Sequence, residues 1–191
     1  WIDSHEDIMS MQEQLLVAAL TAVKAAHGEE IKRLFDVDVV IPTVPFPRIP
    51  LAEAIDIVAK RGHEITRGGD MDPEGERQIA AHVAEEFGHE FVFLTDYPAT
   101  VRPFYHMRHE HDQKLTKSYD LIWRGTEITT GAQREHRYDV LVEQVKSKGL
   151  EPEGLSTYLD FFKYGAPSHG GFGMGLLRVL MLLLHQPNIR E

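Results

Sequence analysis

The sequence predicts an α+β domain in which helices pack on a largely antiparallel sheet. Three observations lead to this prediction. Helical and strand-like patterns are mixed along the chain without the regular alternation that builds a parallel sheet. The hydrophobic fraction is 42% and the charged fraction 26%, which is typical of a globular domain. The length of 191 residues fits one domain, assigned to residues 1–191.

The first half of the chain combines helices with extended segments. Ser4 is expected to begin a helix that runs to about Phe35, with Asp7 forming an imperfect capping box. Alternating apolar residues predict a strand over 37–41. The prolines of 42–50 predict a rigid extended connector. Further expected elements are helices over 51–61 and 72–88 and a buried strand over 91–94.

The second half is expected to hold one long strand and three helices. Extended structure resumes at 104–107, and the long strand covers 119–129. A Gly-Ala-Gln turn at 131–133 then leads into a helix over 134–148. The remaining expected elements are helices over 153–164 and 176–185, the second of which follows a glycine-rich run over 170–175.

The bulk composition excludes several classes of protein. No cysteine is present, which excludes disulfides and thiolate metal sites and favours a reducing, cytoplasmic compartment. No apolar run approaches the roughly 20 residues of a membrane span, so no membrane partner is expected. The net charge of -10 argues against general attraction to nucleic acid. RNA binding through a local basic surface or another domain stays open.

The long strand carries charges that a core strand does not normally have. Residues two apart share a face of a strand, so Asp120 and Glu127 lie on opposite faces if the strand is regular. They converge only if a bulge intervenes, for which Gly125 is the expected place. Two carboxylates with a hydroxyl from Thr129 or Thr130 would suit Mg²⁺. The alternative is a surface strand with solvated charges.

Two arginines near the end of the chain suggest anion binding. Arg134, at the expected entry of a helix, can grip a carboxylate with two hydrogen bonds or simply be exposed there. Arg178 lies on the first turn of an apolar helix, where it either meets an anion or ring or reaches out to solvent. The glycines before it allow close approach of a ligand. A P-loop is excluded, because no Gly-Lys-Ser/Thr follows them.

Several motifs, taken in order, resemble one family. They are Asp72-Pro73-Glu74-Gly75-Glu76-Arg77, Pro103-Phe104-Tyr105, Tyr119-Asp120, Gly125-Thr126-Glu127-Ile128, Gly131-Ala132-Gln133-Arg134-Glu135-His136-Arg137, and the glycine run with Arg178, ending in Asn188-Ile189-Arg190-Glu191. Together they resemble the aspartyl-tRNA synthetase family of class II, in its archaeal-type branch. The resemblance covers nearly the whole chain. It implies the class II fold, an antiparallel sheet flanked by helices.

The resemblance also implies roles for individual residues. Asp120 and Glu127, assisted by Thr130, would hold the Mg²⁺ ions that bridge the phosphates of ATP. Arg134 would bind the side-chain carboxylate of L-aspartate. Glu127 and Arg178 would act in catalysis. The other implied contacts are those of Arg178, Gly173 and Gly175 with ATP, and those of Tyr105, Gln133 and His169 with the amino acid.

The implied reaction has two steps. The aspartate carboxylate attacks the α-phosphate of ATP and pyrophosphate leaves. The terminal hydroxyl at the 3′ end of tRNA(Asp) then attacks the aspartyl-adenylate. Whether tRNA(Asn) is charged as well stays open. Positioning and neutralisation of phosphate charge would supply the catalysis. The implied partners are tRNA, L-aspartate and a second copy of the protein.

The chain departs from the family pattern in two ways. The first two signature motifs and the anticodon-binding domain would precede Trp1. We therefore expect a C-terminal portion of the catalytic domain, inactive alone, whose homodimer forms through the missing part. Leu177 stands where the family usually has glutamate. The alternatives are a paralogue that makes asparagine from aspartate, ATP and ammonia, a less favoured asparaginyl-tRNA synthetase, and a non-catalytic scaffold.

Overall fold

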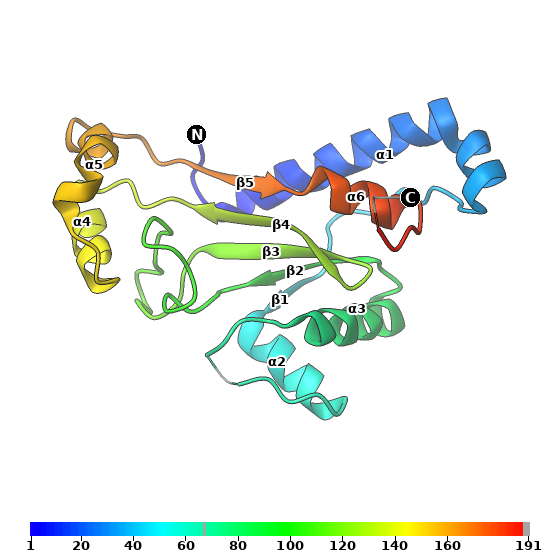
Figure 1. Cartoon of the computed structure of the whole chain (residues 1–191), viewed down its shortest axis with the longest axis horizontal. Coiled ribbons are helices and arrows are strands. Elements are labelled where there is room, and N and C mark those ends of the chain that lie inside the picture. Colours follow the sequence, from blue (N-terminus) through cyan, green and yellow to red (C-terminus); the bar gives the residue numbers. More distant parts are fainter. Residues whose placement is uncertain (67, 189–191) are drawn as a thin grey trace.

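A five-stranded sheet forms the centre of the molecule, with helices on both of its faces (Figure 1). The computed structural model describes residues 1–66 and 68–188. The strands lie side by side in chain order, with β1 parallel to β2 and the other neighbours antiparallel. They are β1 (Arg48–Pro50), β2 (Phe91–Thr95), β3 (Ser118–Trp123), β4 (Thr126–Gln133) and β5 (Gly170–Met174). The predicted α+β class with a largely antiparallel sheet is confirmed.

The helices begin and end mostly where their capping residues predict. Ser4 and Asp7 form both hydrogen bonds of the capping box at the start of α1. Asp72 accepts a hydrogen bond from Gly75 at the start of α3. Among the described residues, no helix is long and apolar enough to cross a membrane. The helices are α1 (His5–Phe35), α2 (Leu51–Lys60), α3 (Pro73–Phe87), α4 (Tyr138–Ser147), the 3₁₀ helix η1 (Pro152–Leu155), α5 (Ser156–Lys163) and α6 (Leu176–Leu183).

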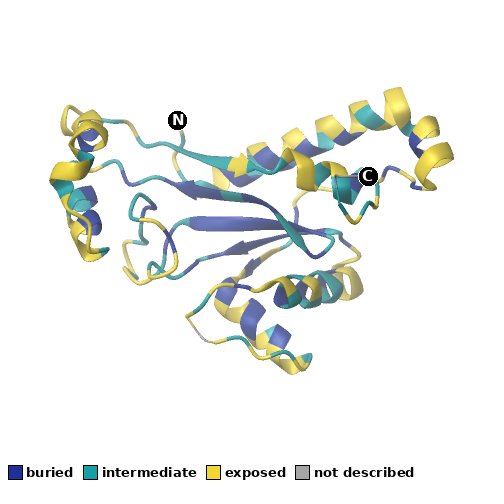
Figure 2. Cartoon of the chain, in the orientation of Figure 1, coloured by how far each residue is buried: buried dark blue, intermediate teal, exposed yellow. Residues whose placement is uncertain are grey.

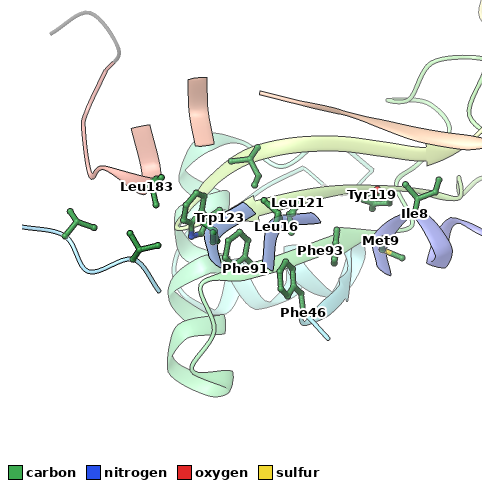
Figure 3. Packing of buried hydrophobic residues seen from close by; sticks show 14 of the residues in the cluster. Ile8, Met9, Leu16, Phe46, Phe91, Phe93, Tyr119, Leu121, Trp123 and Leu183 are labelled. Atoms are coloured by element: carbon green, nitrogen blue, oxygen red, sulfur yellow. The ribbon is translucent and has the colours of Figure 1, made fainter. Parts of the chain in front are cut away.

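The two faces of the sheet bury separate apolar clusters. Long helix α1 and the end of α6 cover one face, where Phe46 stacks on Phe91, and Phe91 on Trp123 (Figure 3). Helices α2 and α3 cover the other face over β1 to β3, around Ile122 and Leu94. Because side chains alternate along a strand, β3 contributes to both clusters and is buried along its whole length (Figure 2).

The predicted strand over 37–41 is absent, and the structure has no regular secondary structure there. Val37 and Val39 are nevertheless buried, since they pack into the cluster beneath α1. Their alternation therefore reflects one-sided packing and not membership of the sheet. The connector predicted to be extended is instead interrupted by a bend at Val44 and Pro45, where the peptide bond is cis. Its last residues form β1 at the sheet edge, where a missing proline N–H is tolerated.

The predicted single strand over 119–129 is a hairpin. Arg124 and Gly125, at φ 48° and 80°, form the turn between β3 and β4. The expected bulge exists, but in β4 and not at Gly125. Leu121 lies opposite Thr129 and Ile122 opposite Glu127, which leaves Ile128 as the extra residue.

The helix predicted over 134–148 begins only at Tyr138, and the expected turn over 131–133 belongs to β4. The strand continues through Gly131 because the Tyr119 ring packs over that residue. A Cβ on Gly131 would lie 2.3 Å from the ring. Two smaller differences concern the ends of helices. The helix predicted over 153–164 divides into η1 and α5, and α6 ends at Leu183 instead of residue 185.

Candidate active site

The face of the sheet opposite α1 is uncovered over β5 and is called the open face. On β5, a Cβ added to Gly170 would meet Ile8 of α1, so this residue points toward the helix. A Cβ on Gly171 or Gly173 would meet nothing within 4 Å. Glycines on β5 thus leave free space on this face of the sheet.

A row of predicted site residues crosses this open face. Asp120 on β3 lies opposite Thr130 on β4, which in turn lies opposite Gly173 on β5. The Thr130 hydroxyl donates a hydrogen bond to the Glu127 carboxylate at 3.1 Å. Because Ile128 is the extra residue of the bulge, Glu127 and Thr130 share a face although they are three apart. The structure therefore brings Asp120, Glu127 and Thr130 together.

Arg178 approaches the same group from the start of α6. Its guanidinium donates to the main-chain oxygen of Glu127 at 2.7 Å and lies 3.7 Å from the Glu127 carboxylate. The Gly175 N–H donates to the Ile128 carbonyl at 2.9 Å and holds the first turn of α6 against β4. The Arg178 side chain is 54% exposed and is therefore accessible from solvent.

Glu76 is a site residue that the sequence reasoning did not select. It lies on the first turn of α3, and its carboxylate accepts a hydrogen bond from the Glu127 N–H at 2.8 Å. Burial raises the pKa of Glu76, the bond from Glu127 lowers it, and the negative charge of Glu127 raises it again. The signal in the sequence was its place in the Asp72–Arg77 motif, which contributes to the family resemblance but did not indicate a role for Glu76 itself.

Arg102 is the second missed residue. Its guanidinium donates to the Asp120 carboxylate, and both side chains are buried. It also lies 3.6 Å from the centre of the Tyr97 ring. Burial lowers the pKa of Arg102, but the charge of Asp120 and its hydrogen bond, together with smaller contributions from Tyr97 and Asp70, make the net direction upward. Arg102 directly precedes the Pro103-Phe104-Tyr105 motif, but nothing in the local sequence links it to Asp120.

The predicted amino-acid contacts meet at the end of β4. Arg134 stacks on Tyr105, with its guanidinium carbon 4.5 Å from the ring centre. The Arg134 N–H donates to the His169 carbonyl at 2.9 Å. All three line a cavity of about 460 Å³, a size suited to a small ligand. The other lining residues are Tyr158, Phe162, Gly170, Gly171 and Phe172.

Gln133 lies apart from this cavity. It precedes Arg134 on the strand and therefore points to the opposite face. Its buried side chain donates to the Ser168 hydroxyl at 3.2 Å. A larger cavity of about 910 Å³, lined in part by Arg108 and Lys148, contains none of the predicted site residues. We place the site at the smaller cavity, because convergent polar groups mark a binding site better than size does.

The acidic group fits a divalent cation that is shared with a ligand. Among the described residues, no three histidine, aspartate or glutamate side chains gather closely enough to hold a metal ion alone. Asp120 has a buried carboxylate oxygen, Oδ1, without a hydrogen-bond partner in the described part of the chain. Mg²⁺ is commonly held by one or two carboxylates together with substrate phosphates. Asp120, Glu127 and the Thr130 hydroxyl match that donor set.

Comparison with known proteins identifies the family. The model of the class II tRNA synthetases (D, K and N) matches residues 1–191. The chain belongs to this family. It is 41% identical over 191 residues to an aspartate–tRNA(Asp) ligase of Pyrococcus furiosus, covering 100% of the chain and 43% of that protein. It is 44% identical to an aspartate–tRNA(Asp/Asn) ligase of Aeropyrum pernix, again covering 100% of the chain and 43% of the relative.

Solved structures of class II synthetases share the fold. An aspartyl-tRNA synthetase from Entamoeba histolytica has a TM-score of 0.92 and 30% identity, covering 100% of this chain and 40% of that one. An asparaginyl-tRNA synthetase from Pyrococcus horikoshii has a TM-score of 0.87 and 31% identity, covering 100% and 45%. The chain spans about 43% of the length of its first curated relatives. The stated resemblance is confirmed, although its last residues, 189–191, lie outside the described part.

Proposed function

We propose that residues 1–191 are the C-terminal part of the catalytic domain of an aspartate–tRNA ligase. The protein would activate L-aspartate with ATP and transfer it to the 3′ end of tRNA(Asp). The observation that supports this most is the placement of Arg134 directly after the end of β4, four residues beyond Thr130 in the strand. They are four residues apart, which is about 13 Å along a strand. That distance suits a ligand whose carboxylate lies at one end and whose phosphates lie at the other.

At the amino-acid end, Arg134 would bind the side-chain carboxylate of aspartate with two parallel hydrogen bonds. Its stacking on Tyr105 limits the directions in which the guanidinium can point. His169 would close the cavity beside the substrate, since it stacks on Phe162 with ring centres 6.0 Å apart. Gln133 would support this end from the opposite face and would not touch the substrate.

At the phosphate end, Arg178 would neutralise charge on ATP as the α-carboxylate of aspartate attacks the α-phosphate. Gly173 would let the nucleotide approach the strand, and Gly175 would anchor the helix that carries Arg178. Asp120, Glu127 and Thr130 would hold Mg²⁺, which when bound offsets phosphate charge. The chain's own contribution is to hold carboxylate and phosphate in line for attack.

The proposal extends to partners and compartment. We propose tRNA as the acceptor, a homodimer as the assembly and the cytoplasm as the location. Some relatives are described as ligases for tRNA(Asp) and others as ligases for tRNA(Asp/Asn). The range of tRNAs charged by this protein is therefore part of the experiment.

Asparagine-specific activity is the second candidate, because structures of asparaginyl-tRNA synthetases resemble this chain closely. Arg134 favours aspartate, since a guanidinium complements a carboxylate better than a neutral amide. A paralogue that makes asparagine with ammonia would use the same activation site. A non-catalytic scaffold is disfavoured by the presence of Asp120, Glu127, Arg134 and Arg178 around one open face.

One experiment separates the aspartate–tRNA ligase from the paralogue that makes asparagine. The full-length protein receives labelled aspartate, ATP, Mg²⁺, ammonia and bulk tRNA. Label in acid-precipitable tRNA supports the ligase, and label in free asparagine supports the paralogue. Label that stays in free aspartate contradicts both. The Glu127→Ala variant should lose adenylate formation, whereas Glu30→Ala, an exposed change on α1, should retain it.

A further inference from the structure

We infer that Glu76 of α3 is a positioning residue for Glu127 and thereby for the cation site. The inference rests on the proposed function and deepens it. It begins from a hydrogen bond of 2.8 Å between the Glu127 N–H and the Glu76 carboxylate. Glu76 reaches β4 from a helix that lies 51 residues earlier in the chain, at the phosphate end of the open face.

The bond lies beside the bulge in β4. Where Ile128 is inserted, the regular ladder between β3 and β4 is interrupted. The Glu127 N–H directly precedes this interruption, and it donates to α3 through Glu76. The bulge turns Glu127 toward Thr130, and Glu76 holds it in that position.

Helix α3 is a rigid support for this contact. Asp72 caps its first turn through the Gly75 N–H at 2.7 Å. The residue after Glu76 supports the hairpin as well, since a Cβ on Gly125 would lie 3.1 Å from the Arg77 Cα. Adjacent residues of α3 therefore hold the turn and the first part of β4. Any displacement of Glu127 requires the hairpin to move away from the helix.

The need for a hydrogen-bond acceptor does not by itself explain why residue 76 is a glutamate. Its carboxylate stands close to the like charges of Glu127 and Asp120, which act on it electrostatically. Like charges at short range disfavour one another. A neutral acceptor such as glutamine would make the same hydrogen bond without that repulsion. Hydrogen bonds to charged acceptors are stronger, so the carboxylate gives a firmer hold on Glu127.

The test compares Glu76→Ala, Glu76→Gln and wild type in the full-length protein. The readouts are the Mg²⁺ dependence of aspartate-dependent ATP–pyrophosphate exchange, and Mn²⁺ binding in the presence of ATP followed by electron paramagnetic resonance. Glu76→Ala should raise the Mg²⁺ concentration for half-maximal exchange about tenfold, because an ionic hydrogen bond is lost. The KM for aspartate should stay within about twofold, since Arg134 lies at the far end of β4.

Glu76→Gln keeps an acceptor oxygen and should recover most of the loss, to within about threefold of wild type. The matched control is Glu74→Ala. Glu74 lies on the same first turn of α3 but pairs with Arg77 and Gln78, not with β4. This variant should show the wild-type Mg²⁺ dependence. If circular dichroism shows that Glu76→Ala is unfolded, Glu76→Asp replaces it, because its shorter side chain cannot reach Glu127.

Two outcomes overturn the inference. One is an unchanged Mg²⁺ and Mn²⁺ dependence in a folded Glu76→Ala or Glu76→Asp variant. The other is a glutamine variant as impaired as alanine, which would assign the effect to charge and not to positioning. If the wild-type protein shows no aspartate-dependent ATP–pyrophosphate exchange, that result contradicts the proposed function and not the role of Glu76. Mn²⁺ binding with ATP then still decides the role of Glu76.

Discussion

Arg102 and Asp120 form a buried ion pair beneath the open face of the sheet, with side chains that are 8% and 6% exposed. The Tyr97 ring covers the guanidinium from the other side. Asp120 is thus held in place before any ligand arrives, while its second oxygen stays without a partner in the described structure. The pair links residues 102–105 to β3, the strand that carries Asp120.

Breaking this pair should destabilise the fold. We expect Arg102→Met to lower the free energy of unfolding by about 3 to 5 kcal/mol, because it leaves the buried Asp120 charge uncompensated. The double variant Arg102→Met/Asp120→Asn should recover part of that loss. Urea denaturation measures both. Arg61→Ala, which breaks the surface pair with Glu85, should leave the midpoint nearly unchanged. If Arg61→Ala lowered the free energy of unfolding as much as Arg102→Met does, the larger effect expected for the buried pair would be contradicted.

Arg134 should determine affinity for the amino acid. We expect Arg134→Ala to raise the KM for aspartate about 10- to 100-fold, because a charge-assisted bond of about 1.5 to 3 kcal/mol is lost. The KM for ATP should change little. Steady-state pyrophosphate exchange with the full-length protein measures both constants, and Arg33→Ala at the exposed end of α1 is the control. A rise in the KM for ATP alone would contradict this prediction and would indicate that Arg134 contacts the phosphates.

The two kinds of glycine in the sheet should respond differently to substitution. We expect Gly173→Val to leave the urea midpoint close to wild type, because a Cβ there meets nothing. It should raise the KM for ATP, since the side chain would fill the open face. Gly131→Ala should instead cost about 1 to 3 kcal/mol of stability, because its Cβ would overlap the Tyr119 ring. A Gly173→Val protein with an unchanged KM would argue against ATP binding over β5.

His106 should make stability depend on pH. Burial, with Arg134 and Arg102 nearby, lowers its pKa to about 3. His106 takes up a proton near pH 6.5 in the unfolded chain but only near pH 3 in the folded one. Its contribution to the free energy of unfolding is therefore fully present at neutral pH and is lost as pH falls from 6.5 toward 3. Between pH 6 and 5, His106→Gln should therefore lose stability less steeply than wild type, by about 1 kcal/mol per pH unit. Urea midpoints at these pH values provide the measurement.

Comparison of the variant with wild type isolates His106 from other titrating groups. His5, whose pKa burial and His109 lower to about 4, adds to the loss with the same sign. Glu13 and Glu76 oppose it, since burial raises the pKa of each. All three remain in the variant. Parallel stability curves for His106→Gln and wild type would contradict the prediction.

The elements that the sequence predicted well are those with local physical causes. Helix α1 follows from the Ser4 and Asp7 capping box, and α3 from the Asp72 cap and the left-handed Gly88. Short-range patterns also indicated the buried strand β2 and the helices after it. These features depend on residues a few positions apart, which the chain order alone places together.

The errors have long-range causes. The Arg124–Gly125 turn was missed because arginine is an unusual first residue in such a turn, whereas Asn-Gly or Asp-Gly is the common signal. The turn predicted over 131–133, where Gly131 is typical of a loop by its residue type, is the last part of β4. Residue 131 is glycine because Tyr119 packs on it from the neighbouring strand. Tyr119 is not close to Gly131 in the sequence, so no local pattern indicates the contact.

The sequence by itself determined the class of fold, the family resemblance, and the residue types of the site. Capping, alternation and motif order are local properties, and they need no knowledge of the packed chain. Tertiary structure alone decided how Asp120 and Glu127 come to share a face, through a hairpin and a bulge at Ile128. It also decided that Glu76 and Arg102 support them, since contacts across 51 and 18 residues form only when the helices and strands pack together.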